Sequence, residues 1–108
     1  MLVDLDMKKV KDASMILRAL RNSLREGIFT VIGEHPGITV TELYRHLHIE
    51  QTVVSKHLAI LRRSGIVRTE REGKKIHYYL DETNINTIAL LVEQLAGFAV
   101  PARFSLKE

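Results

Sequence analysis

Five side chains that can hydrogen bond to nucleic acid lie within seven consecutive residues. They are Gln51, Thr52, Ser55, Lys56 and His57. Glutamine can pair with adenine through two hydrogen bonds, serine and threonine can serve either base, and lysine suits guanine or a phosphate. If one surface presents these side chains together, they can contact base edges in a DNA groove.

An α-helix over residues 51–63 would provide such a surface. One apolar stripe recurs at the spacing of a helical face, formed by Val54, Leu58 and Leu61. This stripe is expected in the core, which leaves the polar side chains outside. His57 lies near the edge of the stripe, so packing is an alternative to DNA contact there. Gly65 is expected to end the helix, because glycine readily adopts positive φ.

A β-hairpin is predicted directly after this helix. Residues 66–71 and 74–80 are rich in β-branched and aromatic residues and meet at a tight turn at Glu72-Gly73. Side chains alternate between the two faces of a strand, so Tyr78 is expected in the core and His77 nearer the solvent. Basic residues that could meet DNA phosphates from the helix end and the hairpin are Arg62, Arg68, Arg71, Lys74 and Lys75.

Positive charge is concentrated in this region. Residues 45–75 contain eight basic and three acidic residues, a net charge of +5. The whole chain carries +3, so the remainder carries −2. A polyanion-binding surface needs such a local excess, although a Lys- and Arg-rich segment can also be an ordinary solvated face.

The residues before this helix predict the rest of a helix-turn-helix. Helices are expected over residues 6–20 and from Asn22 or Ser23 to Gly33, where Ser23-x-x-Glu26 has the form of a capping box. A short strand is expected over residues 38–40. Thr39-x-x-Glu42 is a second capping box and should begin a helix that ends near His48. Together with a last helix, this gives a mainly α-helical winged helix-turn-helix with about five helices and a β-hairpin wing.

The terminal segments carry more apolar surface than a three-helix core with a wing can cover. The last helix is expected over residues 82–99. We expect a homodimer in which the first and last helices form the interface, which suits a two-fold symmetric DNA site. The alternative is that the last helix packs on its own core. The expected interface residues are Leu2, Leu5, Val10, Ile85, Ile88, Val92 and Leu95.

Other classes of protein find little support in the 108 residues, which we expect to form a single domain over residues 1–108. No cysteine is present, so disulfides and thiolate metal sites are excluded. No apolar run approaches the roughly 18 residues of a membrane span, and no signal segment opens the chain, so a cytoplasmic protein is expected. Glycine-rich phosphate loops, nucleophile elbows and H-E-x-x-H motifs are all lacking, so we expect neither an enzyme nor a cofactor.

The five histidines are scattered and predict no metal site. His46 and His48 are two residues apart, so their side chains diverge on a helix. A site shared between two subunits, for example His46 or His48 of one with Asp4 or Asp6 of the other, stays open.

The segment from Leu20 to Leu80 resembles the ArsR-type bacterial transcriptional repressors. The resemblance rests on Ala19-Leu20, Thr39-Val40-Thr41-Glu42-Leu43, Val54-Ser55-Lys56-His57-Leu58, Leu61-Arg62, Gly65-Ile66-Val67 and Arg71-Glu72-Gly73-Lys74. It implies a dimeric winged helix-turn-helix repressor that binds an inverted-repeat operator in double-stranded DNA and releases it on sensing a signal.

This sequence departs from the family at its metal sites. Metal-sensing members carry Cys-x-Cys on the helix that here contains Glu42-Leu43-Tyr44-Arg45-His46-Leu47. Others carry Asp-x-His near the start of the last helix, and further along it a His with a Glu or His three residues on. Of the second set only Asp81 is kept, because the other positions are Thr83, Gln94 and Gly97. The resemblance therefore implies a DNA-binding regulator with an unknown inducer, for which a small molecule is one option. The alternative is a winged-helix protein-interaction module without specific DNA binding.

Overall fold

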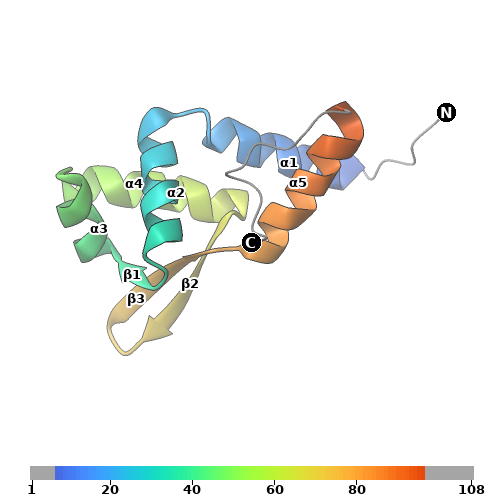
Figure 1. Cartoon of the computed structure of the whole chain (residues 1–108). Helices are drawn as coiled ribbons and strands as arrows, with labels where there is room; N and C mark the ends of the chain where they lie inside the picture. Colours follow the sequence, from blue (N-terminus) through green and yellow to red (C-terminus); the bar gives the residue numbers. More distant parts are fainter. Residues whose placement is uncertain (1–6, 97–108) are drawn as a thin grey trace.

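Five helices and a three-stranded sheet form residues 7–96, the part of the chain that the computed structural model describes (Figure 1). No helix within that range is long and apolar enough to cross a membrane. The elements follow the order α1 (Met7–Ala19), α2 (Ser23–Glu34), β1 (Ile38–Thr39), α3 (Val40–Leu47), α4 (Gln51–Ser64), β2 (Val67–Glu72), β3 (Lys75–Leu80) and α5 (Glu82–Ala96).

Asn22 caps the second helix. Its side-chain oxygen accepts hydrogen bonds from the backbone N–H groups of Leu24 and Arg25, at 2.9 and 3.0 Å. Asn22 is one of the two predicted caps, but the predicted box of Ser23 and Glu26 is wrong, because Ser23 is already the first helical residue. A box needs its first residue outside the helix, in extended conformation.

The helix-turn-helix consists of α3 and α4. The capping box of Thr39 and Glu42 is confirmed, with the Thr39 N–H donating to the Glu42 carboxylate at 3.0 Å. His48 ends α3 in the left-handed conformation, at φ 57°. Gly65 ends α4 at φ 88°, as its conformational freedom predicts.

The wing is the antiparallel pair β2 and β3, and β1 adds to the outer side of β3 to give the order β1-β3-β2. Glu72 pairs with Lys75, so the two-residue turn is Gly73-Lys74 and lies one residue beyond the predicted position. Positive φ at the first turn residue, 62° at Gly73, suits a hairpin turn with glycine in that place. Tyr78 faces the core, as predicted.

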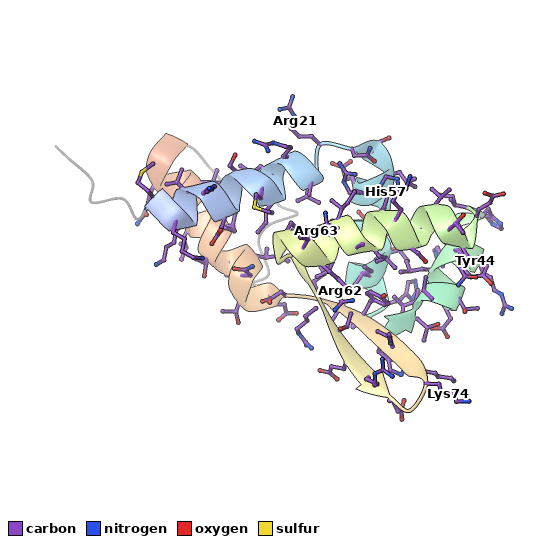
Figure 2. The ribbon with its side chains drawn as sticks, turned by 180° about the vertical axis from the view of Figure 1, so that it is seen from behind. Arg21, Tyr44, His57, Arg62, Arg63 and Lys74 are labelled. Atoms are coloured by element: carbon purple, nitrogen blue, oxygen red, sulfur yellow. The ribbon has the colours of Figure 1, made fainter. Side chains whose placement is uncertain are left out.

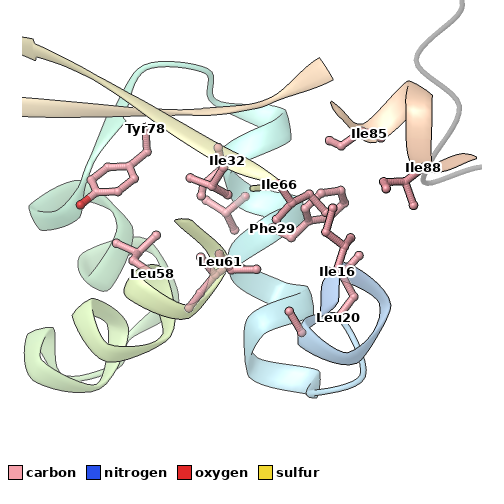
Figure 3. Close-up of a cluster of buried hydrophobic side chains, with 14 of the residues drawn as sticks. Ile16, Leu20, Phe29, Ile32, Leu58, Leu61, Ile66, Tyr78, Ile85 and Ile88 are labelled. Carbon is pink, nitrogen blue, oxygen red and sulfur yellow. The ribbon is translucent and has the colours of Figure 1, made fainter. Parts of the chain in front are cut away.

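Apolar residues from the helices and the wing meet in one core (Figure 3). Each helix contributes at least one side chain that is almost completely buried, and the strands contribute from the base of the wing. The bulkiest such side chains are Ile16, Ile28, Ile32, Leu43, Leu58, Leu61, Ile66 and Ile85. The recognition helix candidate α4 is thus held by contacts with α1, α2 and α3.

Helix α5 packs on the core of its own chain. Ile85 and Ile88 are only 1% and 3% exposed in a single subunit. The expectation that these two side chains form a dimer interface is therefore wrong, since they have almost no surface left to bury. Val10 and Val92 keep partial exposure. Leu2, Leu5 and residues 97–99 of the predicted last helix lie outside the described residues, as does the side chain of Leu95.

The junction of α4, the wing and α5 depends on Gly65. The Asn84 side-chain amide donates to the Gly65 carbonyl at 2.6 Å, and the Asp81 N–H donates to the Ile66 carbonyl at 2.8 Å. A β-carbon at Gly65 would lie 2.7 Å from the Asn84 nitrogen. The glycine therefore supplies both a positive φ and the space for this contact.

We predict that Gly65→Ala lowers the free energy of unfolding by about 1–3 kcal/mol, because alanine is strained at positive φ and displaces Asn84. Gly27→Ala is the matched control. It lies inside α2, where an added β-carbon would meet open space beyond the backbone of its own helix, and alanine there should stabilise by about 0.5–1 kcal/mol. Urea unfolding measures both changes, and a neutral Gly65→Ala would contradict the account of the junction.

Candidate nucleic-acid interface

The exposed surface of α4 presents most of the predicted base-contacting residues. Thr52 and Lys56 are exposed on the side opposite the buried stripe. Gln51 and Ser55 are also exposed, and they share a flank of the helix with Arg62, which follows Gln51 by eleven residues. Figure 2 shows Arg62 on the side of α4 that faces the wing. The candidates for base contact thus occupy two adjoining strips of α4, and Arg62 continues the strip of Gln51 and Ser55.

His57 lies on the opposite flank, toward α2. Its ring is half-buried, and its Nδ1 lies 3.2 Å from Nη1 of Arg25. Because a guanidinium can only donate, Nδ1 accepts and the ring is neutral. Burial, followed by the charges of Arg25 and Lys56, lowers the pKa of His57. This geometry favours the packing alternative, so we remove His57 from the proposed base contacts.

The tip of the wing carries exposed cations. Arg71, Lys74 and Lys75 are all exposed, and Lys74 lies in the turn (Figure 2). Lys74 and Lys75 also line a groove of about 450 Å³ between the wing and α3, together with Arg45. Sequence reasoning counted the charge of Arg45 but did not assign it a contact. Its place beside two wing lysines makes it a further candidate for a phosphate.

Arg68 differs from the cations at the tip because it lies near the base of the wing. It pairs with Glu70 at 2.7 Å, and its guanidinium carbon lies 4.6 Å from the ring centroid of Tyr79. Both contacts occupy the guanidinium within the wing. It also lines a cavity against α2, with Phe29 and Leu80. We therefore separate Arg68 from the residues proposed to meet DNA.

His77 fastens the wing to the loop before β1. Its Nδ1 lies 2.7 Å from the Gly37 carbonyl and its Nε2 lies 3.0 Å from the Glu72 carboxylate. Both oxygen atoms accept, so both ring nitrogens donate when the ring is protonated. The Gly37 carbonyl and then Glu72 raise the pKa of His77.

Two histidines that are eleven residues apart meet in the fold. The ring centroids of His35 and His46 lie 5.1 Å apart, one on the loop after α2 and the other on α3. Their spacing in the sequence does not predict this contact. Among residues 7–96, no group of three His, Asp or Glu residues is arranged to hold a metal ion. Asp4 and Asp6, which the shared site between subunits would need, lie outside this range.

Comparisons with known proteins agree on a DNA-binding regulator. A sequence profile described as MarR family matches residues 27–75, which run from within α2 through the helix-turn-helix and β2 to the first residue of β3. The transcriptional activator HlyU of Vibrio cholerae is 32% identical over 88 residues, which cover 82% of this chain and 81% of HlyU. The structure of HlyU superposes with a TM-score of 0.66 and covers 84% of this chain and 98% of that one, at 31% identity.

One further relative is similar in sequence and another in structure. The HTH-type transcriptional repressor SmtB of Mycobacterium tuberculosis is 37% identical over 85 residues, covering 79% of this chain and 62% of SmtB. A possible ArsR-family regulator from Mycobacterium bovis, described as a homodimeric winged helix-turn-helix DNA-binding domain, superposes with a TM-score of 0.68. It covers 90% of this chain and 88% of that one at 21% identity, which supports the fold alone.

His77 and His57 should affect the stability of the fold in opposite pH ranges. The pKa of His77 is raised from its ordinary value of 6.5, so the contacts of the protonated ring stabilise the fold fully at pH values below 6.5. This stabilisation disappears as pH rises through the pKa of His77 in the folded state. The pKa of His57 is lowered from 6.5, so the neutral ring stabilises the fold fully at pH values above 6.5. This stabilisation disappears as pH falls through the pKa of His57 in the folded state.

We therefore predict that His77→Gln flattens the pH dependence of the unfolding free energy above 6.5, and that His57→Gln flattens it below that value. Urea unfolding at a series of pH values measures both profiles, and each variant is the control for the other. If either substitution flattened the opposite limb, the assigned protonation states would be wrong.

Proposed function

Since this chain belongs to the ArsR-type family of winged helix-turn-helix transcriptional regulators, we propose that it is a homodimeric repressor of inverted-repeat operators. The observation that supports this best is the outward surface of α4, which exposes Gln51, Thr52, Ser55 and Lys56, together with the exposed cations at the tip of the wing. Its relatives include a named activator and a named repressor, so the direction of regulation is part of the proposal.

Helix α4 would enter the major groove. Gln51 and Ser55, on the first two turns, would contact base edges, and Thr52 and Lys56 would contact bases or the adjoining phosphates. Arg62 lies further along the same flank as Gln51, where it would meet the backbone on the side of the wing. This arrangement separates residues that read sequence from residues that position the helix.

The wing would supply the other backbone contacts. Arg71, Lys74 and Lys75 at its tip, with Arg45 across the groove, present positive charge to phosphates or to the minor groove. Neutralised phosphates release counterions, so these contacts strengthen binding to any sequence and make it depend on salt.

A second copy of the chain would cover the apolar surface that α1 and α5 leave exposed. Met7 is 70% exposed, Leu90 61% and Leu17 36%. Val10, Leu17 and Val92 line a groove of about 290 Å³ between the two helices. Burial of such surface contributes about 25 cal/mol per Å² of apolar area. The whole chain, residues 1–108, would form one domain, with Leu2, Leu5 and Leu95 adding to this interface.

The regulator would act in the cytoplasm, without catalysis and without a bound cofactor. Its signal would be a small molecule or a partner rather than a metal, because all of the family's metal ligands except Asp81 are replaced here. The lack of cysteine also removes a thiol response.

We predict that Gln51→Ala or Ser55→Ala reduces discrimination between the operator and random DNA by about 1–3 kcal/mol where the contact is bidentate. Arg71→Ala or Lys74→Ala should weaken both DNAs alike and make the salt slope less negative by about one for each phosphate that is no longer bound. Fluorescence anisotropy with labelled operator and random duplexes separates these effects. Equal weakening of both DNAs by all four variants would contradict the roles of helix and wing.

We predict that Leu17→Glu and Leu90→Glu convert a dimer into a folded monomer, because a charge cannot be buried in an apolar interface without a partner. The monomer should bind the operator far more weakly, since it engages one half-site. Sedimentation velocity at micromolar concentration measures the change, and Lys9→Glu on the exposed part of α1 is the control. A wild-type protein that sediments as a monomer would disprove the dimer.

A further inference from the structure

Three arginines from three helices surround one small cavity on the side of α4 away from the wing. Arg18 comes from α1, Arg25 from α2 and Arg63 from the last turn of α4. The apolar lining of the cavity consists of Met15, Ala19 and Ile60. The cluster could not be predicted from the sequence, since its members are 7 and 38 residues apart and meet only through the packing of α1 and α2 against α4.

Arg25 is held in a fixed position within the cluster. Its Nε donates to the Ala19 carbonyl at 2.7 Å, and its Nη1 donates to Nδ1 of His57 at 3.2 Å. These two bonds use two of the five N–H groups of the guanidinium. The others remain available to a ligand, and the side chain loses little entropy on binding it because it is already ordered.

The cluster has a net positive charge that its own residues do not neutralise. No Asp or Glu lines the cavity. Within the described part of the chain, neither Arg18 nor Arg63 forms a salt bridge, whereas Arg68 pairs with Glu70. Three guanidinium groups around one space favour an anion, and planar N–H pairs fit the oxygens of a phosphate or carboxylate.

The size of the cavity limits the size of the anion that it can hold. Its volume is about 180 Å³. Pockets for drug-sized ligands measure about 300–1,000 Å³, so this one suits a single anionic group rather than a whole effector. A phosphate that belongs to a larger molecule outside the cavity meets this requirement.

The position of Arg63 points to DNA as that molecule. Arg63 follows Lys56 by seven residues and Thr52 by eleven, so all three lie on the outward stripe of α4. Figure 2 shows Arg63 on the part of α4 beside α1, while the wing with Lys74 lies on the other side of the helix. If Thr52 and Lys56 enter the major groove of DNA, the sugar-phosphate backbone on the side of that groove away from the wing would come close to Arg63.

We infer that Arg18, Arg25 and Arg63 form a second clamp for the DNA backbone, which binds one operator phosphate on the side of α4 opposite the wing. This inference rests on the proposed function. The clamp gives each half-site backbone contacts on both sides of the recognition helix, and it contributes affinity and register rather than base discrimination.

The test measures operator and random-duplex affinities across a salt series for Arg18→Gln, Arg63→Gln and Arg63→Lys. Each glutamine variant should lower the affinity for both DNAs by the same factor. The slope of log affinity against log salt concentration should become less negative by about 0.9 for each phosphate that is no longer bound. The homodimer has two such clamps and would bind two phosphates through them. Arg63→Lys keeps the charge and should keep most of the slope. Lys9→Gln removes the same charge from α1 outside the cluster and should leave the slope unchanged. Circular dichroism and urea midpoints establish that each variant folds.

Slopes for Arg18→Gln and Arg63→Gln that equal the Lys9→Gln slope would overturn the clamp. If Ser55→Ala and Lys74→Ala still behave as proposed, the clamp alone fails; if they do not, the proposed function fails with it. A second arm heats the DNA-free protein in inorganic phosphate and in chloride at equal ionic strength. A phosphate-dependent rise in Tm that Arg63→Gln abolishes, with unchanged DNA slopes, would assign the cluster to a free anion and overturn the clamp.

Discussion

The structure depends on the burial of one stripe of α4. Val54, Leu58 and Leu61 are 0%, 1% and 0% exposed, so the helix cannot rotate about its axis without exposing them to water. Full burial of each such side chain contributes about 1.5–3 kcal/mol. With the rotation fixed, the helical period determines which side chains face outward, and Thr52, Lys56 and the other polar residues take that direction. The chemistry of the surface is thus a consequence of the core.

Elements specified by neighbouring residues could be predicted from the sequence. The α4 stripe, the Thr39–Glu42 box and the stop at Gly65 each depend on contacts within one helix or at its end. The wing was predicted from strand composition and a glycine turn, with an error of one residue in the turn. That error does not change which residues of the two strands face the core. The burial of one face of β3 determines the pairing register, and the turn then follows from it.

Contacts between distant segments could not be predicted. The Arg25–His57 contact joins residues 32 apart, and the arginine cluster brings together three helices. Periodicity shows that a residue is buried but not what covers it, which is why Ile85 and Ile88 were assigned to a partner subunit rather than to their own core. Charge counting had the same limit: it located the basic segment and missed the arginines of α1 and α2 that the fold places beside it.

In vitro selection from a pool of random DNA duplexes shows whether the homodimer recognises an inverted repeat, because the operator sequence is the result of the experiment rather than its starting point. We predict enrichment of an inverted repeat whose half-sites lie about one helical turn, roughly 10 bp, or a multiple of it apart, which reflects two α4 helices related by a dimer axis. Enrichment of a single asymmetric site, or no enrichment over the starting pool, would contradict it.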